Sequence, residues 1–171
     1  RKCLFCHNAF PEIENDRYGD PERFPHDLPE GTGCQRCHGP GGEHVTTALT
    51  SGDLDAIRSL IINPRKLTGE VRDSVCMQCH LLPSISLVTP LKFGQGEMSF
   101  RPGNLLSDFV AQLDVREVGV VEPDRFEINH HGYRLMKSEC YQQGGLSCID
   151  CHNPHVKPDS NVFREKVAGV C

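Results

Sequence analysis

Ser138-Glu-Cys-Tyr-Gln-Gln-Gly-Gly-Leu-Ser-Cys-Ile-Asp-Cys-His-Asn-Pro-His155 is the stretch that decides the fold of this 171-residue chain. Inside it, Cys148 and Cys151 are separated by two residues, and His152 follows directly. Two thiols at this spacing can join the two vinyl groups along one edge of a porphyrin, and the adjacent imidazole can bind the iron. The pattern therefore predicts covalent attachment of a c-type haem.

The same pattern occurs three more times along the chain, as Cys3, Cys6 and His7, as Cys34, Cys37 and His38, and as Cys76, Cys79 and His80. A Cys-x-x-Cys pair can also belong to a thioredoxin-like dithiol or to half of a zinc site. Neither of these requires a histidine directly after the second cysteine, and here one follows every pair. The sequence therefore predicts four c-type haems, whose proximal iron ligands are His7, His38, His80 and His152.

The composition leaves little material for a conventional hydrophobic core. The chain has no Trp, only 6% aromatic and 37% hydrophobic residues, and 16 Gly and 12 Pro. Four porphyrins would supply the missing apolar mass. We therefore expect a mostly α and irregular-loop fold with little β structure, a compact multihaem cytochrome c wrapped around four stacked haems. By length, residues 1–171 form a single domain, with two lobes, about 1–90 and 91–171, as the alternative.

Periodicity and capping signals predict four helices and one short strand. The expected helices cover residues 50–62, 71–80, 104–113 and 127–143, and the strand covers 115–121. Ser51 or Asp53 can cap the first helix, and Asn63-Pro64 ends it. The helix at 127–143 has the clearest pattern, and Gly144-Gly145 provides its stop signal.

Five histidines are left for the distal positions of four irons, namely His26, His44, His130, His131 and His155. His155 lies three residues after His152, a reach of about 10 Å at most, so His155 must serve a different haem. The short glycine-rich link between His38 and His44 leads to the same expectation for His44. Neighbouring helix residues point about 100° apart, so His130 and His131 serve different haems, or only one of them is a ligand.

Sulfur-containing side chains offer further alternatives. Met77, Met98 and Met136 could bind iron, but with enough histidines present we expect them to pack in the core. Eight of the ten cysteines belong to the four motifs, and the remaining two are Cys140 and Cys171. In an oxidising compartment these two form a disulfide candidate. Alternatively, Cys171 opens a further haem motif, or both are free thiols.

Three segments, 33–44, 75–80 and 138–155, carry a resemblance to known proteins. They resemble the multihaem c-type cytochromes related to the tetrahaem cytochromes of the hydroxylamine pathway, especially members joined to tetratricopeptide repeats. The chain is also similar to the compact tetrahaem subunits of extracellular cytochrome filaments. The resemblance implies bis-histidine haems in parallel-stacked and perpendicular pairs, and electron transfer as the activity. The chain differs from the repeat-linked members because it contains no tetratricopeptide repeat.

The charge of the chain argues against nucleic acid as a partner, and its hydropathy argues against a transmembrane segment. The net charge is −5 with a pI near 6.0, and no basic cluster is present, which argues against nucleic acid. No apolar run approaches the roughly 18 residues of a transmembrane segment. Since c-type haem is attached outside the cytoplasm, we expect an extracytoplasmic protein, extracellular or at the cell surface, with the periplasm as the alternative.

The leading functional expectation is electron transport by a bis-histidine multihaem cytochrome, not an enzyme. The first motif begins at residue 3, with little sequence before it to cover a haem, which favours self-association into an extracellular filament. Other redox proteins or extracellular electron acceptors are the further partners. One alternative is a redox enzyme acting on a small nitrogen or sulfur compound, which would need an open iron position. Another is a haem-bearing segment of a larger multihaem protein.

Overall fold

The computed structural model describes residues 2–10, 24, 26–81, 91–96, 98–112, 131–156, 164–165 and 168–169. Within these ranges the chain is mostly helical and contains no strand, only an isolated antiparallel bridge between Leu91 and Val110. The expected mostly α fold is confirmed, while the expected strand at 115–121 lies outside the described residues. None of the helices in these ranges is long and apolar enough to cross a lipid bilayer.

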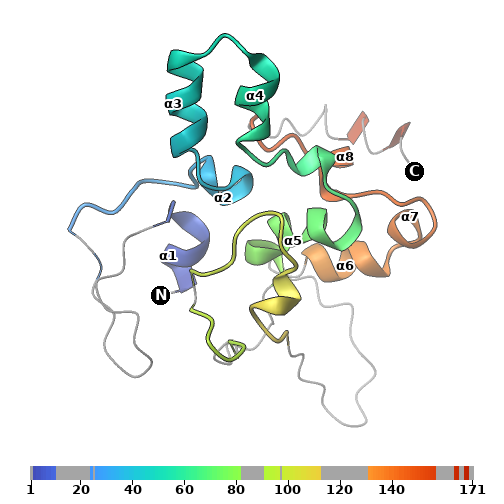
Figure 1. Cartoon of the computed structure of the whole chain (residues 1–171). Coiled ribbons are helices and arrows are strands. Elements are labelled where there is room, and N and C mark those ends of the chain that lie inside the picture. Colours follow the sequence, from blue (N-terminus) through green and yellow to red (C-terminus); the bar gives the residue numbers. More distant parts are fainter. Residues whose placement is uncertain are drawn as a thin grey trace.

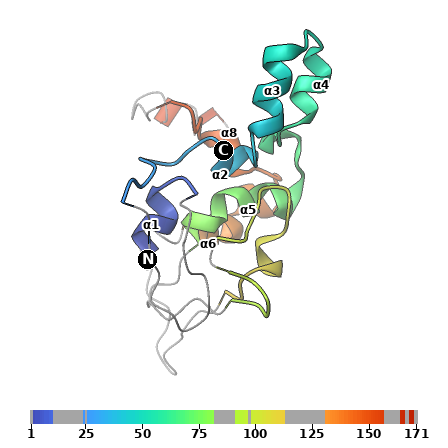
Figure 2. The same cartoon turned by 60° about the vertical axis from the view of Figure 1, so that its left-hand side comes forward.

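The helices are short and are grouped around one central helix, α5 (Figure 1). In chain order they are α1 (Lys2–His7), α2 (Gln35–His38), α3 (Gly42–Thr50), α4 (Leu54–Ser59), the 3-10 turn η1 (Pro64–Lys66), α5 (Gly69–His80), the 3-10 turn η2 (Leu106–Asp108), α6 (His131–Lys137), α7 (Glu139–Gln142) and α8 (Cys148–Cys151). Helix α5 contacts α1, α2, α6, η1 and η2. The pair α3 and α4 forms a hairpin that projects from this body (Figure 2).

Each Cys-x-x-Cys-His motif lies on a helical turn. Helix α1 carries the first motif, α2 the second, the end of α5 the third and α8 the fourth. Residues three apart in a helix lie on the same face, with Cβ atoms about 5–6 Å apart. The helical turn therefore presents the two cysteine positions of a motif on one side, as attachment to one edge of a porphyrin requires.

The apolar core of the described residues is small. Its buried hydrophobic side chains are Val75, Met77, Phe100 and Leu106. Met77 belongs to the central cluster and Met136 packs against it, so both have the core position that the sequence predicted. Within the described ranges, so few buried apolar side chains contribute little hydrophobic stabilisation.

Two of the expected helices are shorter in the structure, for identifiable reasons. The helix predicted at 50–62 is α4, which ends at Ser59 because the backbone N–H of Ile62 bonds to the carbonyl of His38 instead of continuing the helix. The helix predicted at 104–113 is only the turn η2. Its backbone is engaged elsewhere, since the Ser74 hydroxyl accepts a hydrogen bond from the N–H of Leu106.

The helix predicted at 127–143 is interrupted. Residues 127–130 lie outside the described residues, and the remainder divides into α6 and α7 at Ser138. Ser138 has an extended backbone, and its hydroxyl accepts a hydrogen bond from the N–H of Tyr141, so it caps the second helix. The helix predicted at 71–80 is confirmed as the main part of α5.

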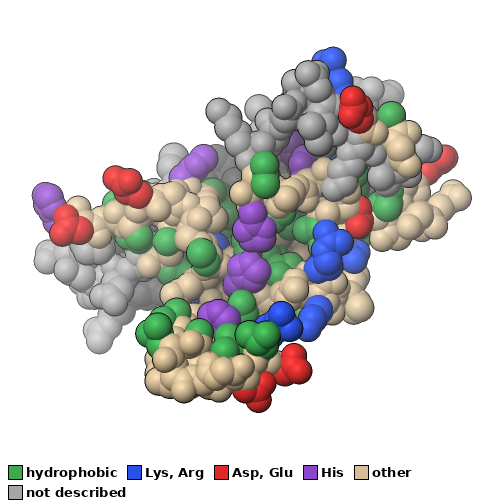
Figure 3. Space-filling view, turned by 90° about the horizontal axis from the view of Figure 1, so that it is seen from above, with side chains coloured by type: hydrophobic (Ala, Val, Ile, Leu, Met, Phe, Trp, Pro, Cys, Tyr) green, Lys and Arg blue, Asp and Glu red, His purple; other side chains and the backbone are tan. Residues whose placement is uncertain are grey.

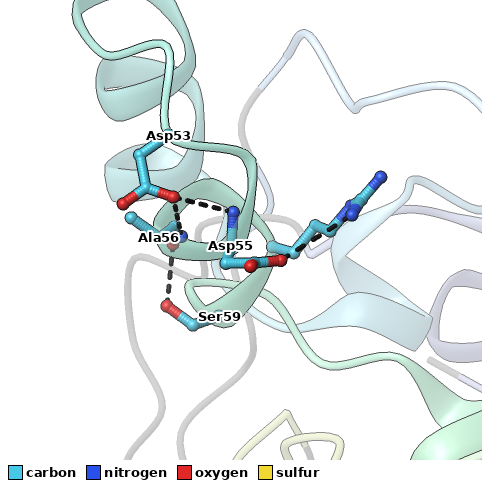
Figure 4. Close-up of polar contacts among 5 residues, drawn as sticks. Asp53, Asp55, Ala56 and Ser59 are labelled. Carbon is cyan, nitrogen blue, oxygen red and sulfur yellow. Dashed lines mark hydrogen bonds and ion pairs between the residues drawn. The ribbon is translucent and has the colours of Figure 1, made fainter.

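The start of α4 illustrates how side chains fix these short helices (Figure 4). The Asp53 carboxylate accepts hydrogen bonds from the backbone N–H groups of Asp55 and Ala56, at 3.0 and 3.1 Å. It thereby satisfies two amide groups that the first helical turn leaves without partners. Asp55 is placed differently, because its carboxylate only meets the exposed Arg58 guanidinium at 3.8 Å.

We predict that Asp53→Ala destabilises the protein and that Asp55→Ala does so much less. The first substitution removes a helix cap, which lowers the free energy of unfolding by about 1 kcal/mol. The second removes the same charge from the same helical turn but breaks only a solvent-exposed ion pair. Urea denaturation followed by circular dichroism measures both, and equal losses for the two variants would contradict the capping role.

Candidate haem sites

The histidine of the second motif lies opposite one of the spare histidines. The ring centroids of His38 and His155 are 5.9 Å apart, and their planes are inclined by only 19°. His38 ends α2, and His155 lies in the segment that follows α8. Two parts of the sequence more than a hundred residues apart are thus brought together at this pair.

A second pair has almost the same geometry. The rings of His80, at the end of α5, and His131, at the start of α6, have centroids 6.0 Å apart and planes inclined by 13°. The neighbouring Gly132 allows this approach of α6 to α5. A Cβ atom there would lie 3.1 Å from Cγ of Met77 and 3.4 Å from the carbonyl oxygen of His80, so a larger residue would require the Met77 side chain to shift by a few tenths of an ångström.

The separation within each pair matches the space that one metal ion needs. An imidazole nitrogen lies about 2.0–2.1 Å from a bound first-row metal ion, and the ring centre is about 1.1 Å behind it, so two rings on opposite sides of one ion have centres about 6.3 Å apart. His131 and His155 are exposed residues, so one member of each pair is accessible from the surface. Figure 3 shows histidine side chains in a row across one face, beside hydrophobic side chains.

Backbone carbonyl groups orient two of the histidines. Nδ1 of His38 lies 2.7 Å from the carbonyl oxygen of Ile62, and Nδ1 of His44 lies 2.8 Å from that of Ile57. A carbonyl oxygen can only accept, so each Nδ1 carries the proton and donates it. Metal-binding histidines typically donate their second ring nitrogen in this way, which leaves Nε2 for the metal.

The environment of His80 favours its neutral ring. Partial burial, followed by the nearby rings of His131 and His152, lowers the pKa of His80 from its usual value. Only the neutral imidazole has a lone pair available for a metal ion. At neutral pH these surroundings therefore favour the neutral form of the His80 ring, which is the form that can bind a metal ion.

The cysteines of different motifs converge on α5. Cys76 donates a hydrogen bond to Cys148, and this bond together with burial raises the pKa of the Cys76 thiol. Cys79 accepts a hydrogen bond from Cys6, and this bond lowers the pKa of the Cys79 thiol to about 7. Burial raises this pKa, while the Arg36 guanidinium lowers it further. The third motif therefore adjoins both the first and the fourth.

A buried carboxylate ties α7 to α5 beside these thiols. Asp73 is only 1% exposed, and its Oδ2 accepts a 2.8 Å hydrogen bond from the hydroxyl of Tyr141. This bond raises the pKa of Tyr141, since the carboxylate holds the phenolic proton. The Arg72 guanidinium lies 3.7 Å from the other carboxylate oxygen.

The remaining predicted ligands are distributed over the chain. His26 is fully exposed, with Nδ1 3.2 Å from the Asp27 carboxylate. Within the described residues, the rings of His7, His26 and His44 face no other histidine. His152 lies near His80, as the pKa of His80 records. Three predicted groups lie outside what the structure describes, namely His130, the side chain of Cys3, and Cys171. The predicted disulfide between Cys140 and Cys171 therefore stays a prediction.

The residues of the two histidine pairs fit a haem iron. In the part of the chain that is described, no group of three or more His, Cys, Asp or Glu side chains could hold a metal ion by itself. A porphyrin supplies four ligands to its iron, and two imidazoles complete the set. The motif cysteines lie beside one histidine of each pair in sequence and would provide the covalent attachment points of such a haem.

Sequence reasoning missed several groups that shape these sites. The carbonyl groups of Ile57 and Ile62 carry no side-chain signal, because any residue could supply them. Arg36 and Gln78 occupy variable positions inside the motifs, where the pattern places no requirement. Only their burial, at 1% and 5% exposure, indicates a role.

No protein-family model matches the chain, and no solved structure matches it. The candidate haem sites are therefore defined by the four motifs and by the geometry of the histidine pairs.

We predict that Tyr141→Phe lowers the free energy of unfolding by about 2 kcal/mol, because it leaves the buried Asp73 carboxylate without its hydrogen-bond donor. The double variant Tyr141→Phe with Asp73→Leu replaces both partners by apolar groups and should recover part of this loss. Chemical denaturation of the unmodified protein, the two single variants and the double variant measures the difference. A double variant less stable than the sum of the two single variants would contradict this account.

Proposed function

We propose that the chain binds four c-type haems covalently at its Cys-x-x-Cys-His motifs and transfers electrons between them, outside the cytoplasm. The observation that supports this most strongly is the composition of the two histidine pairs. Each pair combines one motif histidine with one spare histidine, at a separation that suits a single iron. Two imidazoles from separate parts of the chain can bind one haem iron together.

The proposed roles of the paired histidines distinguish an electron carrier from an enzyme. Haem iron supplies one-electron chemistry when bound, and its distal position decides whether small molecules can reach it. His38 with His155, and His80 with His131, would occupy both axial positions of two irons. A site whose ligand positions are all taken by protein is closed to substrate, as in structural metal sites. The pairs therefore favour electron transfer over catalysis.

The contacts between motifs support electron exchange among all four haems. The thiols of Cys6 and Cys148 form hydrogen bonds with Cys79 and Cys76 of the third motif, and the pKa of the Cys37 thiol is raised by burial and by the nearby Cys79. The third motif thus adjoins the other three. We propose that the haem on α5 is the one through which the others exchange electrons.

We predict that His155→Ala and His131→Ala each open one haem. In the oxidised protein, each variant should convert one of the four haems from low-spin to high-spin in the EPR spectrum, and after reduction that haem should bind CO. Val156→Ala, which changes the exposed side chain next to His155, is the control and should leave both signals as in the unmodified protein. Unchanged spin states in both histidine variants would exclude the proposed ligand pairs.

We also propose that the protein self-associates, as expected for a filament subunit. The α3–α4 hairpin projects from the body and exposes the apolar side chains of Val45, Leu49 and Leu54, at 55%, 82% and 60%. Exposed apolar side chains gathered on one projecting element are typical of contact surfaces.

Leu49→Glu should therefore shift the protein toward monomer in static light scattering, because it places a charge in this contact. Thr46→Glu introduces the same charge at an exposed polar position of α3 and should have a smaller effect. An unmodified protein that remains monomeric at high concentration would rule out self-association through this hairpin.

A further inference from the structure

Arg36 is a buried cation at the meeting point of the haem motifs. It is the second variable residue of the second motif and is only 1% exposed. Its guanidinium lies between two aromatic rings, 4.5 Å from the centroid of Phe5 and 4.6 Å from that of Phe10. It also donates a hydrogen bond to the carbonyl oxygen of Phe5.

Equivalent positions of three motifs meet at this point. Phe5, Arg36 and Gln78 are each the residue before the second cysteine of their motif. Nε2 of Gln78 donates hydrogen bonds to the carbonyl oxygens of Arg36, at 2.9 Å, and Val75, at 2.7 Å. We refer to Phe5, Arg36 and Gln78 as the motif junction. It holds the first, second and third motifs against one another.

The positive charge of Arg36 is not neutralised within the described part of the chain. No carboxylate there forms an ion pair with it, and its buried Nε has no hydrogen-bond partner. The two terminal nitrogens face sulfur atoms, Nη1 at 3.8 Å from Sδ of Met98 and Nη2 at 3.9 Å from Sγ of Cys79. Sulfur is a weak acceptor. A buried charge without a counter-ion acts over a longer distance than an exposed one, because water screens it less.

We propose that Arg36 raises the reduction potential of the haems attached at the motif junction, most strongly that of the third motif, whose Cys79 it contacts. The inference rests on the proposed function, since it requires haem at these cysteines. An electron added to the iron reduces the positive charge there. A fixed cation nearby therefore favours the reduced state, and removing the cation favours the oxidised state.

The expected effect is large enough to measure. A unit charge acting over roughly 10 Å at an effective dielectric constant of about 20 changes the equilibrium constant for one-electron reduction by about tenfold. For a one-electron couple, tenfold corresponds to about 59 mV. The haem of the third motif should show this shift, while the fourth motif, which contributes no residue to the junction, should show less.

The test is a spectroelectrochemical titration of the haem-loaded full chain and four variants. Arg36→Gln and Arg36→Met remove the charge, and the second replaces the buried cation by an apolar side chain that such a site can tolerate. Both should lower the potential of at least one haem by about 59 mV, a tenfold change. Arg36→Lys keeps the charge and should leave the potentials close to those of the unmodified protein. Arg58→Gln, at an exposed position of α4, is the matched control and should change none.

The outcomes separate this inference from the proposed function. Protein that carries no haem, as measured by intact mass, would refute both. Four haems with unchanged potentials in Arg36→Gln and Arg36→Met would refute only the role of Arg36. Equal shifts in the lysine and the neutral variants would also refute it, since a loss of packing and not of charge would then be the cause. A lower reduction potential in Arg36→Gln and Arg36→Met, together with an unchanged potential in Arg36→Lys, supports the role of the Arg36 charge.

Discussion

The axial coordination of iron by two imidazoles is the interaction on which the proposed architecture depends. It requires two histidines from different parts of the chain to face each other with room for one atom between them. The pairs His38–His155 and His80–His131 have ring centroids 5.9 and 6.0 Å apart, a separation that suits one metal ion between two imidazoles. Local contacts maintain it, through the carbonyl of Ile62 at the first pair and the absence of a side chain at Gly132 at the second.

The small core gives this coordination a structural importance as well. The described residues bury few apolar side chains, and polar groups such as Asp73 and Gln78 occupy interior positions beside the motifs. The haems would add the apolar surface that the polypeptide lacks, so binding and folding would be coupled, as in small metal-dependent domains. Helix α5 is suited to the centre of such an assembly because it carries one motif and contacts the helices that carry two others.

Some of this could be predicted from the sequence, and the reasons are physical. The four motifs are local patterns with a fixed chemical requirement, and the Asp53 cap and the helix ending at His80 follow from local signals. The reach of a short segment also indicated that His155 must serve a haem other than that of His152. Its partner depends on tertiary packing, and the structure brings it to His38.

The misjudged elements were those in which tertiary contacts replace local ones. Ile62 pairs with His38 and not with the preceding turn, Ser138 caps a new helix, and the segment around Leu106 bonds to Ser74. Helix α3 (Gly42–Thr50) forms directly after Gly41, in a segment for which the sequence predicted no helix before residue 50. The motif junction was also beyond sequence reasoning, because the motif pattern leaves the identity of Arg36 open.

The most direct test of the central claim is an experimental structure of the haem-loaded protein that identifies the two axial ligands of each iron. The account predicts Nε2 of His38 and His155 on one iron and Nε2 of His80 and His131 on another, with nearly parallel ring planes in both pairs. Irons that carry His38 or His80 opposite any other ligand, or with an open position, would contradict it.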